Sequence, residues 1–464
     1  MKMEFMGVMI DTQSLLFNVD SYKVGMFLQS PENTQEVYSY ISSRGGIHAE
    51  TVILGQAEFI KNTLSKRITK EEVEVASAFW NMHGLPFPRE QLLKMVEEWN
   101  GWWPVEFRAV PEGTVVPVGN VIATTKSMDS NYFFVNTWVE TAALRSIWYP
   151  STVATNSREI KKVIKQYLEE TGDVSGLDFK LHDFGFRGVS SHESGLIGGA
   201  AHLTIFRGSD TAAANMFIMD NYGYKEMRGF SIPASEHSTI TSWGREGEFD
   251  AYKNMIDKHP EGALLACVSD SYNIYEACAM WGLLADQIKA KNQTLVVRPD
   301  SGNPLEVLPE VFKILSSWFG GKINEKGYAV MNNVRVIWGD GINAETIKDI
   351  LAMLKKHGYS ADNIAFGMGG ALLQGVVRDD QKWAMKASYA RIDGKNVEVF
   401  KDPITDPGKA SLKGKVDLFK DANGKFFTAV KDCPSMESEL ELMYSPLFVA
   451  PPANFDDVVA RAAI

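Results

Sequence analysis

The stretch LVVRPDSGNP, residues 295–304, decides the fold expected for this chain. It opens with an apolar, β-branched run, which is typical of a buried parallel strand. Arg298 and Asp300 end that run, and Gly302 follows in a turn that leads toward a helix. A cation and a carboxylate therefore stand at the carboxyl end of the strand, the edge at which α/β sheets and barrels bind ligands. For this segment alone a strand-end ion pair is the simpler explanation, so a functional interpretation depends on repetition of the pattern.

Similar segments do recur from residue 179 onward, with helical patterns between them. The eight segments are KLHDFGFRG (180–188), LTIFRGSD (203–210), GFSIPASEHS (229–238), ALLACVSDS (263–271), LVVRPDSG (295–302), VRVIWGDG (334–341), NIAFGMGG (363–370) and AMKASYARI (384–392). Alternating strands and helices indicate parallel βα units. A closed α/β barrel is the economical arrangement of eight such units, and an open doubly wound sheet is the alternative.

The remaining sequence predicts a second domain. We expect residues 1–178 to form a flanking mixed α+β domain, residues 179–390 the α/β barrel, and residues 391–464 a segment that packs back on the flanking domain. Before the barrel, an apolar helix from Tyr132 is expected to stop at Pro150, with a second helix starting near Thr155. The fold class is therefore α/β, with a barrel and a flanking domain built from both chain ends.

Composition excludes several classes of protein. The 464 residues carry a formal net charge of −11, which argues against nucleic acid or an anionic membrane surface as the main partner. The three cysteines, Cys267, Cys278 and Cys433, show no CxxC spacing, so neither a disulfide framework nor a cysteine zinc site is expected. No apolar run approaches the ~18 residues of a membrane span. We therefore expect a soluble, unprocessed protein of the reducing cytoplasm.

A barrel would gather the polar residues at the strand ends around one mouth. These residues are Asp183, Arg187, Asp210, His237, Asp270, Arg298, Asp300, Asp340, Gly369 and Gly370. The Gly339-Asp340-Gly341 turn places a carboxylate where it can accept hydrogen bonds from sugar hydroxyls, although an Asx-turn is the simpler interpretation. We weigh the convergence of these residues above any single motif.

A glycine pair offers a possible phosphate site. Gly369 and Gly370 follow an apolar strand and can present bare backbone N–H groups to a phosphate, and Arg378 adds a cation farther along the chain. Glycine pairs also form ordinary turns, so the phosphate site and the structural turn are equally good interpretations.

His237 is the histidine with the most suggestive surroundings. Its neighbour Glu236 is expected to orient the imidazole ring, although a structural histidine is the commoner case. Phe184 can present an aromatic face to a flat ring, or it can belong to the core. The sequence contains no HExxH motif and no nucleophile elbow, which removes support for metal-dependent peptide hydrolysis and for triad esterase chemistry.

Several of these motifs resemble those of the nicotinamide phosphoribosyltransferase family, and they occur in collinear order over nearly the whole chain. The matching segments are DSYKV (20–24), AVPEG (109–113), WYPSTVATNSRE (148–159), HDFGFRGVSS (182–191), RGSDT (207–211), SIPASEHSTIT (231–241), SDSYNIY (269–275), VRPDSGNP (297–304), VIWGDG (336–341), IAFGMGGALLQ (364–374) and VFKDPITDP (399–407). The resemblance implies a type II phosphoribosyltransferase that works as a homodimer with shared active sites. The implied reaction converts nicotinamide and phosphoribosyl pyrophosphate to nicotinamide mononucleotide and pyrophosphate with Mg²⁺, and ATP is a co-substrate that acts through a phosphohistidine.

The resemblance also implies roles for individual residues. Phe184 and the partner subunit's Tyr22 would enclose the nicotinamide ring, and Asp210 would accept a hydrogen bond from its carboxamide. Arg298 would contact the amide and the phosphates, and His237 would carry the phosphoryl group from ATP. The implied ribose and metal contacts are Asp300, Gly339 and Asp340, with Mg²⁺ held mainly by the substrate phosphates. The implied 5′-phosphate contacts are Gly369, Gly370, Arg378 and Lys386, and the implied pyrophosphate or ATP contacts are Arg44, Arg187, Lys401 and Lys409.

Several departures, among them a shorter loop after Arg44, and two alternatives accompany this resemblance. Phe230 stands where the family usually has tyrosine, and Ala266 and Ala384 stand where it usually has serine, so contacts in the ring pocket and one phosphate hydrogen bond are in question. A nicotinate phosphoribosyltransferase of the same fold is the first alternative, and Asp210 argues against it because two carboxylates repel. A non-catalytic binding or signalling protein on this scaffold is the second.

Overall fold

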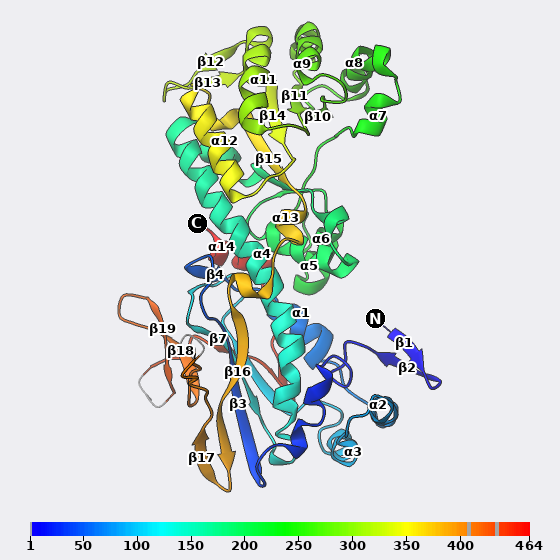
Figure 1. The fold of residues 1–464 in the computed structure, drawn as a ribbon, viewed down its shortest axis with the longest axis vertical. Coiled ribbons are helices and arrows are strands. Elements are labelled where there is room, and N and C mark those ends of the chain that lie inside the picture. The colour runs from blue at the N-terminus through cyan, green and yellow to red at the C-terminus, as the bar shows by residue number, and fades with distance from the viewer. Residues whose placement is uncertain (1, 406–409, 432–435) are drawn as a thin grey trace. The chain divides into compact units, whose positions relative to one another are not determined.

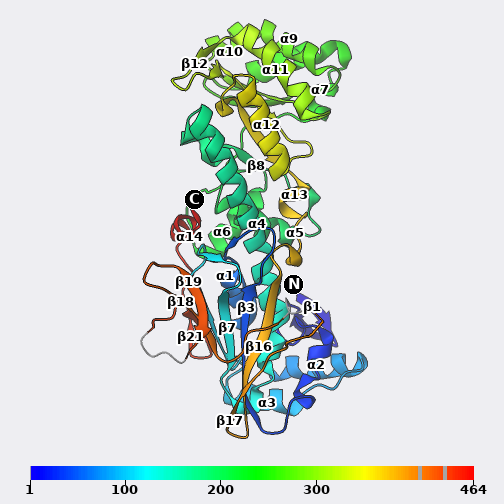
Figure 2. The same cartoon turned by 60° about the vertical axis from the view of Figure 1, so that its left-hand side comes forward.

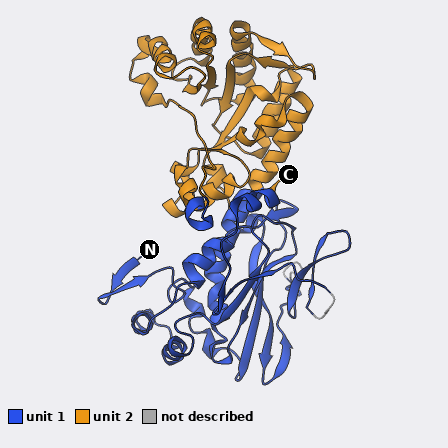
Figure 3. Ribbon diagram, turned by 180° about the vertical axis from the view of Figure 1, so that it is seen from behind, with its two compact units in different colours: residues 1–155, 218–224, 377–462 blue, residues 156–217, 225–376, 463–464 orange. Residues whose placement is uncertain are grey.

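The computed structural model describes residues 2–405, 410–431 and 436–464. The chain divides into two compact units, coloured blue and orange in Figure 3. Unit 1 comprises residues 1–155, 218–224 and 377–462, and unit 2 comprises residues 156–217, 225–376 and 463–464. Unit 1 therefore contains both the first and the last long stretches of the chain. This agrees with the prediction of a flanking domain built from both chain ends.

Unit 2 is organised around a curled sheet of six parallel strands. In spatial order these are β10 (Leu264–Val268), β11 (Thr294–Arg298), β14 (Val334–Trp338), β15 (Ile364–Met368), β8 (Leu181–Asp183) and β9 (Gly208–Ser209). The register pairs Val297 with Cys267 on one side and with Val336 on the other, so the strand predicted from LVVRPDSGNP is central and buried. The α/β class with parallel βα units is thus confirmed.

The two edges of this sheet are connected through residues 230–235. Phe230 forms a parallel bridge to Gly208 of β9, and Ala234 forms one to Ala266 of β10. Only these isolated bridges form where the sequence predicts a third full strand, because Pro233 has no N–H to donate to a ladder. The inside of the curled sheet is filled by Ala266, Val296 and Ile337, with Phe184, Ile232 and Ala365 packed against them.

The prediction that the eighth segment forms a strand of the barrel is wrong. AMKASYARI lies in β16 (Trp383–Ile392), which belongs to unit 1 and pairs antiparallel with β3 (Thr34–Ser43). Its apolar alternation reports burial correctly, but alternation alone does not reveal which sheet buries a strand. The strand therefore contributes to the flanking unit.

Helices connect the strands of unit 2. They are α5 (His192–Leu203), α7 (His237–Thr241), α8 (Glu248–Lys258), α9 (Ile274–Leu283), α10 (Ala285–Ala290), α11 (Pro304–Phe319), α12 (Ala344–Lys356) and α13 (Gly370–Leu373), together with α6 (Ala212–Tyr222), which continues into unit 1. The Asn303 side chain caps α11 by accepting from the Leu305 N–H, and Pro304 occupies the first helical position, where its missing N–H costs nothing. A short hairpin of β12 (Gly321–Ile323) and β13 (Ala329–Met331) follows α11.

Unit 1 contains a seven-stranded antiparallel sheet (Figures 1 and 2). Its order is β17 (Lys395–Glu398), β16, β3, β7 (Val121–Ser127), β5 (Val105–Ala109), β20 (Glu441–Ser445) and β21 (Phe448–Val449). Three further two-stranded antiparallel sheets are β1 (Lys2–Phe5) with β2 (Val8–Asp11), β4 (Glu50–Val52) with β6 (Val115–Pro117), and β18 (Val416–Lys420) with β19 (Phe426–Val430). Helices α1 (Gln56–Phe59), α2 (Lys70–Met82), α3 (Arg89–Glu98) and α14 (Phe455–Ala462) complete the unit. Buried aromatic residues, among them Trp103, Phe107 and Trp138, form much of its core.

The helix α4 (Val135–Thr171) runs from unit 1 into unit 2 without a break. The sequence predicts a stop at Pro150, and that prediction is wrong. Side chains beyond the proline are fixed in unit 1: the Ser151 hydroxyl accepts from the Leu54 N–H, and Thr155 accepts from the Val52 N–H. These buried hydrogen bonds offset the one that proline removes. Although α4 has 37 residues, neither it nor another helix in the described part of the chain is long and apolar enough to cross a membrane.

Candidate functional site

The polar residues that follow the parallel strands lie along one edge of the unit 2 sheet. Parallel strands place all their carboxyl ends on the same side, so one sheet edge receives the loops after β8, β9, β10, β11, β14 and β15. The predicted site residues within unit 2 are Phe184, Arg187, Asp210, His237, Arg298, Asp300, Gly339, Asp340, Gly369 and Gly370. Those within unit 1 are Tyr22, Arg44, Arg378, Lys386 and Lys401, and Lys409 lies outside the described residues.

Phe184 forms an aromatic platform at this edge. Its N–H donates to the Met368 carbonyl at 3.0 Å, which anchors the residue to β15. A Cβ on Gly367 would come within 1.9 Å of the Phe184 ring, and one on Gly339 within 3.2 Å. Residue 367 must therefore be glycine for the half-buried ring to occupy its place across β14 and β15. The arrangement gives a flat ligand one fixed aromatic face.

Asp210 lies beside this platform with two hydrogen-bond donors in place. His182 Nε2 is 2.8 Å from Asp210 Oδ1, and the Ser231 hydroxyl donates to the same oxygen at 2.6 Å. Burial alone would raise the pKa of Asp210, but the hydrogen bond and charge of His182, the Ser231 hydroxyl and the charge of Arg298 together hold that pKa below its usual value. The half-exposed carboxylate is therefore charged and oriented before any ligand arrives.

His182 and Ser231 were not among the predicted site residues. A signal for His182 was present, because side chains two residues apart in a strand share a face, and Phe184 follows it at that spacing. Ser231 carries no comparable signal, since its place beside Asp210 depends on the bridge between Phe230 and Gly208.

His237 is held by a carboxylate that is distant in sequence. Its Nε2 lies 3.0 Å from Asp270 Oδ1, and the other oxygen of Asp270 accepts from the Asp300 N–H and from the Ser301 hydroxyl. The expected orienting residue, Glu236, instead accepts from Ser238, so that prediction is wrong. An Nε2–H that donates to Asp270 leaves Nδ1 with its lone pair. The ring is about half exposed, which leaves Nδ1 available to an incoming group.

The end of β11 and the turn after β14 supply a cation and two carboxylates. Arg298 Nε is buried and has no hydrogen-bond partner among the described residues. Asp300 and Asp340 form no ion pair with a described residue, and Asp300 Oδ1 lies next to Gly339, where a Cβ would meet it at 3.4 Å.

These carboxylates suit a magnesium ion that is held mainly by its substrate. Mg²⁺ prefers oxygen ligands and usually binds through one or two carboxylates together with substrate phosphates and water. In the described part of the chain, no three His, Cys, Asp or Glu side chains converge as a metal site. Asp300 and Asp340 therefore fit a shared metal, and they do not form a cage for a permanently bound one.

The glycine loop after β15 leaves backbone uncovered. A Cβ on Gly370 would meet no atom within 4 Å, so packing does not require glycine there. The turn Phe186–Gly188, which carries Arg187, packs beside this loop, because a Cβ on Gly188 would lie 3.5 Å from the Gly370 Cα. An exposed cation and accessible backbone N–H groups are thus brought together in unit 2.

Unit 1 contains a separate cluster of cations. Lys386 lies on β16 with Lys23, Arg44 and Lys401 near enough to affect it. Burial lowers the pKa of Lys386, the Glu140 carboxylate opposes this, and the charges of Arg44, Lys401 and Lys23 lower it further. Lys23 is itself buried and forms a 2.6 Å ion pair with Glu140, and its Nζ lies 5.0 Å from the centre of the exposed Tyr22 ring. We call Lys23, Arg44, Lys386 and Lys401 the cation cluster.

Two of the substituted positions, Phe230 and Ala266, have structural explanations, and nothing in the structure explains Ala384. The Arg207 guanidinium lies over the Phe230 ring at 4.9 Å, a contact that a phenylalanine makes without a hydroxyl. Ala266 belongs to the apolar filling of the curled sheet, and Ala384 lies on β16 opposite Ser42.

Comparisons with known proteins agree with this geometry. The sequence profile of the nicotinate phosphoribosyltransferase (NAPRTase) family matches residues 179–432, and that of the nicotinamide phosphoribosyltransferase N-terminal domain matches residues 14–107. Two solved structures share the fold: a nicotinate-nucleotide pyrophosphorylase from Pyrococcus furiosus (TM-score 0.62, 16% identity, 99% of this chain and 97% of that chain) and human nicotinic acid phosphoribosyltransferase (TM-score 0.56, 14% identity, 96% and 92%). By its fold and its carboxyl-edge site, the chain falls in the class of phosphoribosyltransferases built on a curled parallel sheet.

A relative in sequence narrows this class. The chain is 46% identical over 425 residues to a protein named nicotinamide phosphoribosyltransferase from Xanthomonas campestris pv. campestris (strain 8004), and the match covers 90% of each chain. The chain belongs to the nicotinamide phosphoribosyltransferase family.

Proposed function

We propose that this chain converts nicotinamide and phosphoribosyl pyrophosphate to nicotinamide mononucleotide and pyrophosphate, a salvage step toward NAD. The observation that carries the proposal is the charged, oriented Asp210 beside the Phe184 platform. The platform takes one face of a pyridine ring, and Asp210 Oδ2 accepts a carboxamide N–H while His182 and Ser231 hold Oδ1. A carboxylate substrate would meet like charge at that point. This supports nicotinamide over nicotinate as the base.

The reaction joins the ring nitrogen to the ribose. The lone pair of the pyridine nitrogen attacks the anomeric carbon, and the bond from that carbon to the pyrophosphate oxygen breaks with its electron pair. Positive charge develops on the sugar while negative charge gathers on the leaving pyrophosphate. Groups that bind the base in line and stabilise the departing anion therefore lower the barrier.

The residues of unit 2 divide this work. Arg298, whose buried Nε lacks a protein partner, donates to the base amide or to a phosphate oxygen. Arg187 and the backbone at Gly369 and Gly370 bind phosphate oxygens. Mg²⁺, when bound with the substrate, adds positive charge at the leaving group, and Asp300 and Asp340 would hold it with the ribose hydroxyls.

ATP is proposed to act through His237. Phosphoryl transfer from the γ-phosphate of ATP to Nδ1 forms the nitrogen–phosphorus bond and releases ADP. Asp270 stabilises the positively charged ring by accepting from Nε2. The phosphohistidine then carries charge and oxygen ligands that favour binding of Mg²⁺ with phosphoribosyl pyrophosphate.

The cation cluster supports a homodimer with shared active sites. The charges of Arg44 and Lys401 act unfavourably on Lys386, and Glu140 is the acidic group that opposes them, a balance that suits binding of phosphates supplied by a second subunit's substrate. Arg378 would serve the 5′-phosphate, and Tyr22 would enclose the base from the side opposite Phe184. We place the reaction in the cytoplasm, where the two buried free thiols, Cys267 and Cys278, stay reduced.

A product assay tests the activity directly. Nicotinamide and nicotinate are supplied side by side with phosphoribosyl pyrophosphate and Mg²⁺, with and without ATP, and both mononucleotides are quantified. We expect nicotinamide mononucleotide as the main product and more of it with ATP. Dominant nicotinate mononucleotide would favour the nicotinate enzyme, and no mononucleotide from either base would favour a non-catalytic protein on this scaffold.

Two measurements test the finer parts. Labelled phosphate from ATP should enter the wild-type chain in an acid-labile form and be absent from His237→Ala; normal ATP stimulation of that variant would refute the coupling role.

For shared sites, inactive Tyr22→Ala and Asp300→Asn chains are unfolded, mixed equally and refolded together. About one quarter of wild-type activity should return if each site uses both chains, and none should return if each site uses one.

A further inference from the structure

Asp183 directly precedes the Phe184 platform in the chain, and the proposed reaction gives it no role. It is the last residue of β8, and its side chain is fully buried. Its register partner in β9 is Ser209, which directly precedes Asp210. A buried carboxyl group is costly unless it accepts hydrogen bonds, so the partners of Asp183 show which parts of the site it stabilises.

One oxygen of Asp183 fixes the turn that follows the aromatic platform. Asp183 Oδ1 accepts from the Gly185 N–H at 2.7 Å, and this contact is buried. A Cβ on Gly185 would lie only 2.7 Å from Leu373 Cγ, so Leu373 packs directly on the same turn. The backbone next to Phe184 is thus held both by a hydrogen bond and by close packing.

The other oxygen fixes the turn that carries Asp210. The Ser209 hydroxyl donates to Asp183 Oδ2 at 3.1 Å, and the same hydroxyl oxygen accepts from the Thr211 N–H at 3.0 Å. The Asp183 main-chain carbonyl accepts from the Asp210 N–H at 3.0 Å. Asp210 and both of its neighbours in the chain are therefore held by hydrogen bonds that lead to Asp183.

Asp183 joins these two turns at the point where strand pairing stops. The ladder between β8 and β9 ends at Asp183 and Ser209. Beyond that point, Gly185 on one turn and Ser209 on the other bind to the two oxygens of one planar carboxyl group. The side chain of Asp183 therefore continues a connection that the backbone no longer makes.

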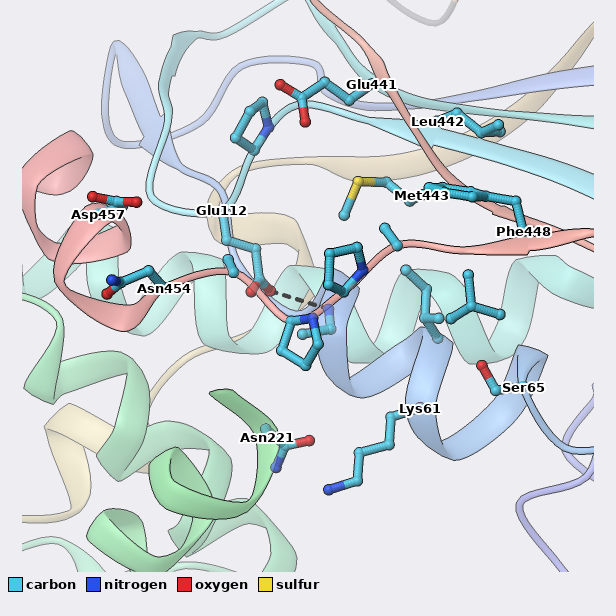
Figure 4. A pocket seen from close by; sticks show the side chains of 18 of the residues that line it. Lys61, Ser65, Glu112, Asn221, Glu441, Leu442, Met443, Phe448, Asn454 and Asp457 are labelled. Atoms are coloured by element: carbon cyan, nitrogen blue, oxygen red, sulfur yellow. Dashed lines mark hydrogen bonds between the residues drawn. The ribbon is translucent and has the colours of Figure 1, made fainter. Parts of the chain in front are cut away.

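A buried carboxyl group in unit 1 offers a comparison. Glu112 lines a pocket of about 570 Å³ (Figure 4). Its Oε1 accepts from the Gly55 and Ala57 N–H groups at 2.7 and 3.3 Å, and its side chain is also hydrogen-bonded by Tyr222. None of these partners belongs to the proposed site, so the role of Glu112 is structural. Each oxygen of Asp183, in contrast, leads to a turn with a proposed base contact.

We propose that Asp183 is a positioning residue, which acts through Ser209 to hold the Asp210 carboxylate in register with the Phe184 platform and so contributes to the preference for a carboxamide base. The inference rests on the proposed function, in which Phe184 and Asp210 contact the same nicotinamide. A displacement of about 1 Å in such a site can cost roughly a hundredfold in rate. Loss of the link should therefore affect use of the base much more than use of phosphoribosyl pyrophosphate.

Ser209→Ala tests the link with a small change in volume. It removes the hydroxyl between Asp183 and the Thr211 N–H, so the KM for nicotinamide should rise roughly tenfold, as for a lost hydrogen bond. The preference for nicotinamide over nicotinate should fall at least about threefold, while the KM for phosphoribosyl pyrophosphate should stay within about twofold. Steady-state assays that vary each substrate in turn measure these values. Ser209→Thr keeps the hydroxyl and should restore the wild-type values.

Asp183→Asn tests the same link from its other end. The amide oxygen can still accept from the Gly185 N–H, but the amide nitrogen cannot accept from the Ser209 hydroxyl. Because both substitutions break one link, the double variant with Ser209→Ala should match Asp183→Asn within about twofold in the KM for nicotinamide. Fully additive losses would overturn the proposal that Asp183 acts through Ser209.

Two variants in unit 1 are the matched controls. Ser127→Ala removes a buried hydroxyl that accepts from the Val37 N–H at 2.8 Å and so connects β7 with β3. Glu112→Gln makes the same acid-to-amide change as Asp183→Asn at a buried carboxyl group with a structural role. Both controls should lower the thermal unfolding temperature and leave the base preference unchanged.

The outcomes separate this inference from the proposed function. If the wild-type chain makes no mononucleotide, both are wrong. If the wild type makes nicotinamide mononucleotide, and folded Ser209→Ala and Asp183→Asn chains keep its KM for nicotinamide and its base preference, only the inference is wrong. An equal rise in both KM values, or an equal change of preference in the unit 1 controls, would also overturn it, because the effect would then be a general loosening of the fold.

Discussion

The carboxylates of unit 2 and the cations of unit 1 are held in opposite ways. In unit 2, Asp210 already has His182 and Ser231 as partners, and Asp270 already holds His237. In unit 1, burial and the charges of Arg44, Lys401 and Lys23 lower the pKa of Lys386, and Glu140 opposes them while it pairs with Lys23. The unit 2 carboxylates thus have their partners in place, whereas Lys386 has more positive than negative charge around it. The proposed base site is thus oriented in advance within unit 2, while the proposed phosphate contacts of unit 1 hold like charges that a bound phosphate would relieve.

The largest effect is expected from Arg298→Ala, which removes the buried donor of unit 2 whose Nε has no partner among the described residues. We predict a loss of roughly 10²- to 10³-fold in kcat/KM, as for other donors that act on developing charge. Steady-state formation of nicotinamide mononucleotide measures it, and thermal unfolding checks that the fold is retained. Arg245→Ala, at an exposed arginine of the same unit, should stay within about twofold. A loss under tenfold for Arg298→Ala would remove Arg298 from the catalytic set.

The next effect concerns the cation cluster. Lys386→Met should raise the KM for phosphoribosyl pyrophosphate by roughly 30- to 100-fold, because it removes a half-buried cation from an anion site. Lys395→Met, at an exposed position of β17, is the matched control.

Lys386→Met should not lower the free energy of unfolding at neutral pH, because Lys386 is surrounded by other cations in the folded chain. The pKa of Lys386 is lowered in the folded chain, so between that value and the ordinary 10.5 the unfolded chain binds more protons. The free energy of unfolding therefore rises with pH across this window in the wild type, and Lys386→Met should lose that rise. Urea unfolding at several alkaline pH values measures it. A marked loss of stability at pH 7 in Lys386→Met would mean that Lys386 is a structural cation.

A smaller effect is expected from Asp210→Ser. Two like charges about 4 Å apart repel by ~1 kcal/mol in water and ~4 kcal/mol at an effective dielectric near 20. Removing Asp210 should therefore lower the preference for nicotinamide over nicotinate by roughly ten- to a hundredfold. Ser231→Ala removes one partner but leaves the charge, so it should keep most of the preference. A competition assay with both bases decides between these outcomes, and unchanged selectivity in Asp210→Ser would contradict the assigned role.

The smallest effect is expected from pH on that selectivity. Burial by itself would raise the pKa of Asp210, but His182, Ser231 and Arg298 hold it below its usual value. The carboxylate therefore stays charged at all pH values above the ordinary carboxyl range, and the stability it contributes is lost only as pH falls through the lowered pKa. The ratio of kcat/KM for the two bases should change by less than about twofold between roughly pH 5.5 and 8.5. A steep change near neutrality would show that the charge state of His182 sets the preference.

The parallel strands of unit 2 were predictable because each is a short apolar run that ends at a polar residue. An apolar run indicates that a strand is buried, but it does not indicate which sheet buries it. The sequence therefore predicts β16 as a barrel strand, although it belongs to the unit 1 sheet. The predicted helix stop at Pro150 is wrong for a related reason. Ser151 and Thr155, which stabilise α4 beyond the proline, accept hydrogen bonds from residues about 100 positions away. Local propensity does not register such contacts.

The site shows the same division. The positions of Phe184, Asp210, Arg298 and Asp300 at the carboxyl edge of the sheet could be predicted because these residues stand at strand ends or in motifs. Their partners depend on register and on loops: Asp270 holds His237 across 33 positions, and Ser231 meets Asp210 across 21. The adjacent Glu236 was the natural guess for His237 and was wrong. Side chains at strand ends can thus be found from sequence patterns more readily than the distant partners that orient them.

The place of β3 in the unit 1 sheet has a consequence for synthesis of the chain. β3 pairs with β7 on one side and with β16 on the other, and about 340 residues separate β3 from β16. β3 presents an unpaired edge until the ribosome makes β16, which follows every strand of the unit 2 sheet in the chain. The unit that begins first is therefore finished last, and its open edge is the surface on which nascent chains can associate wrongly or a chaperone can bind.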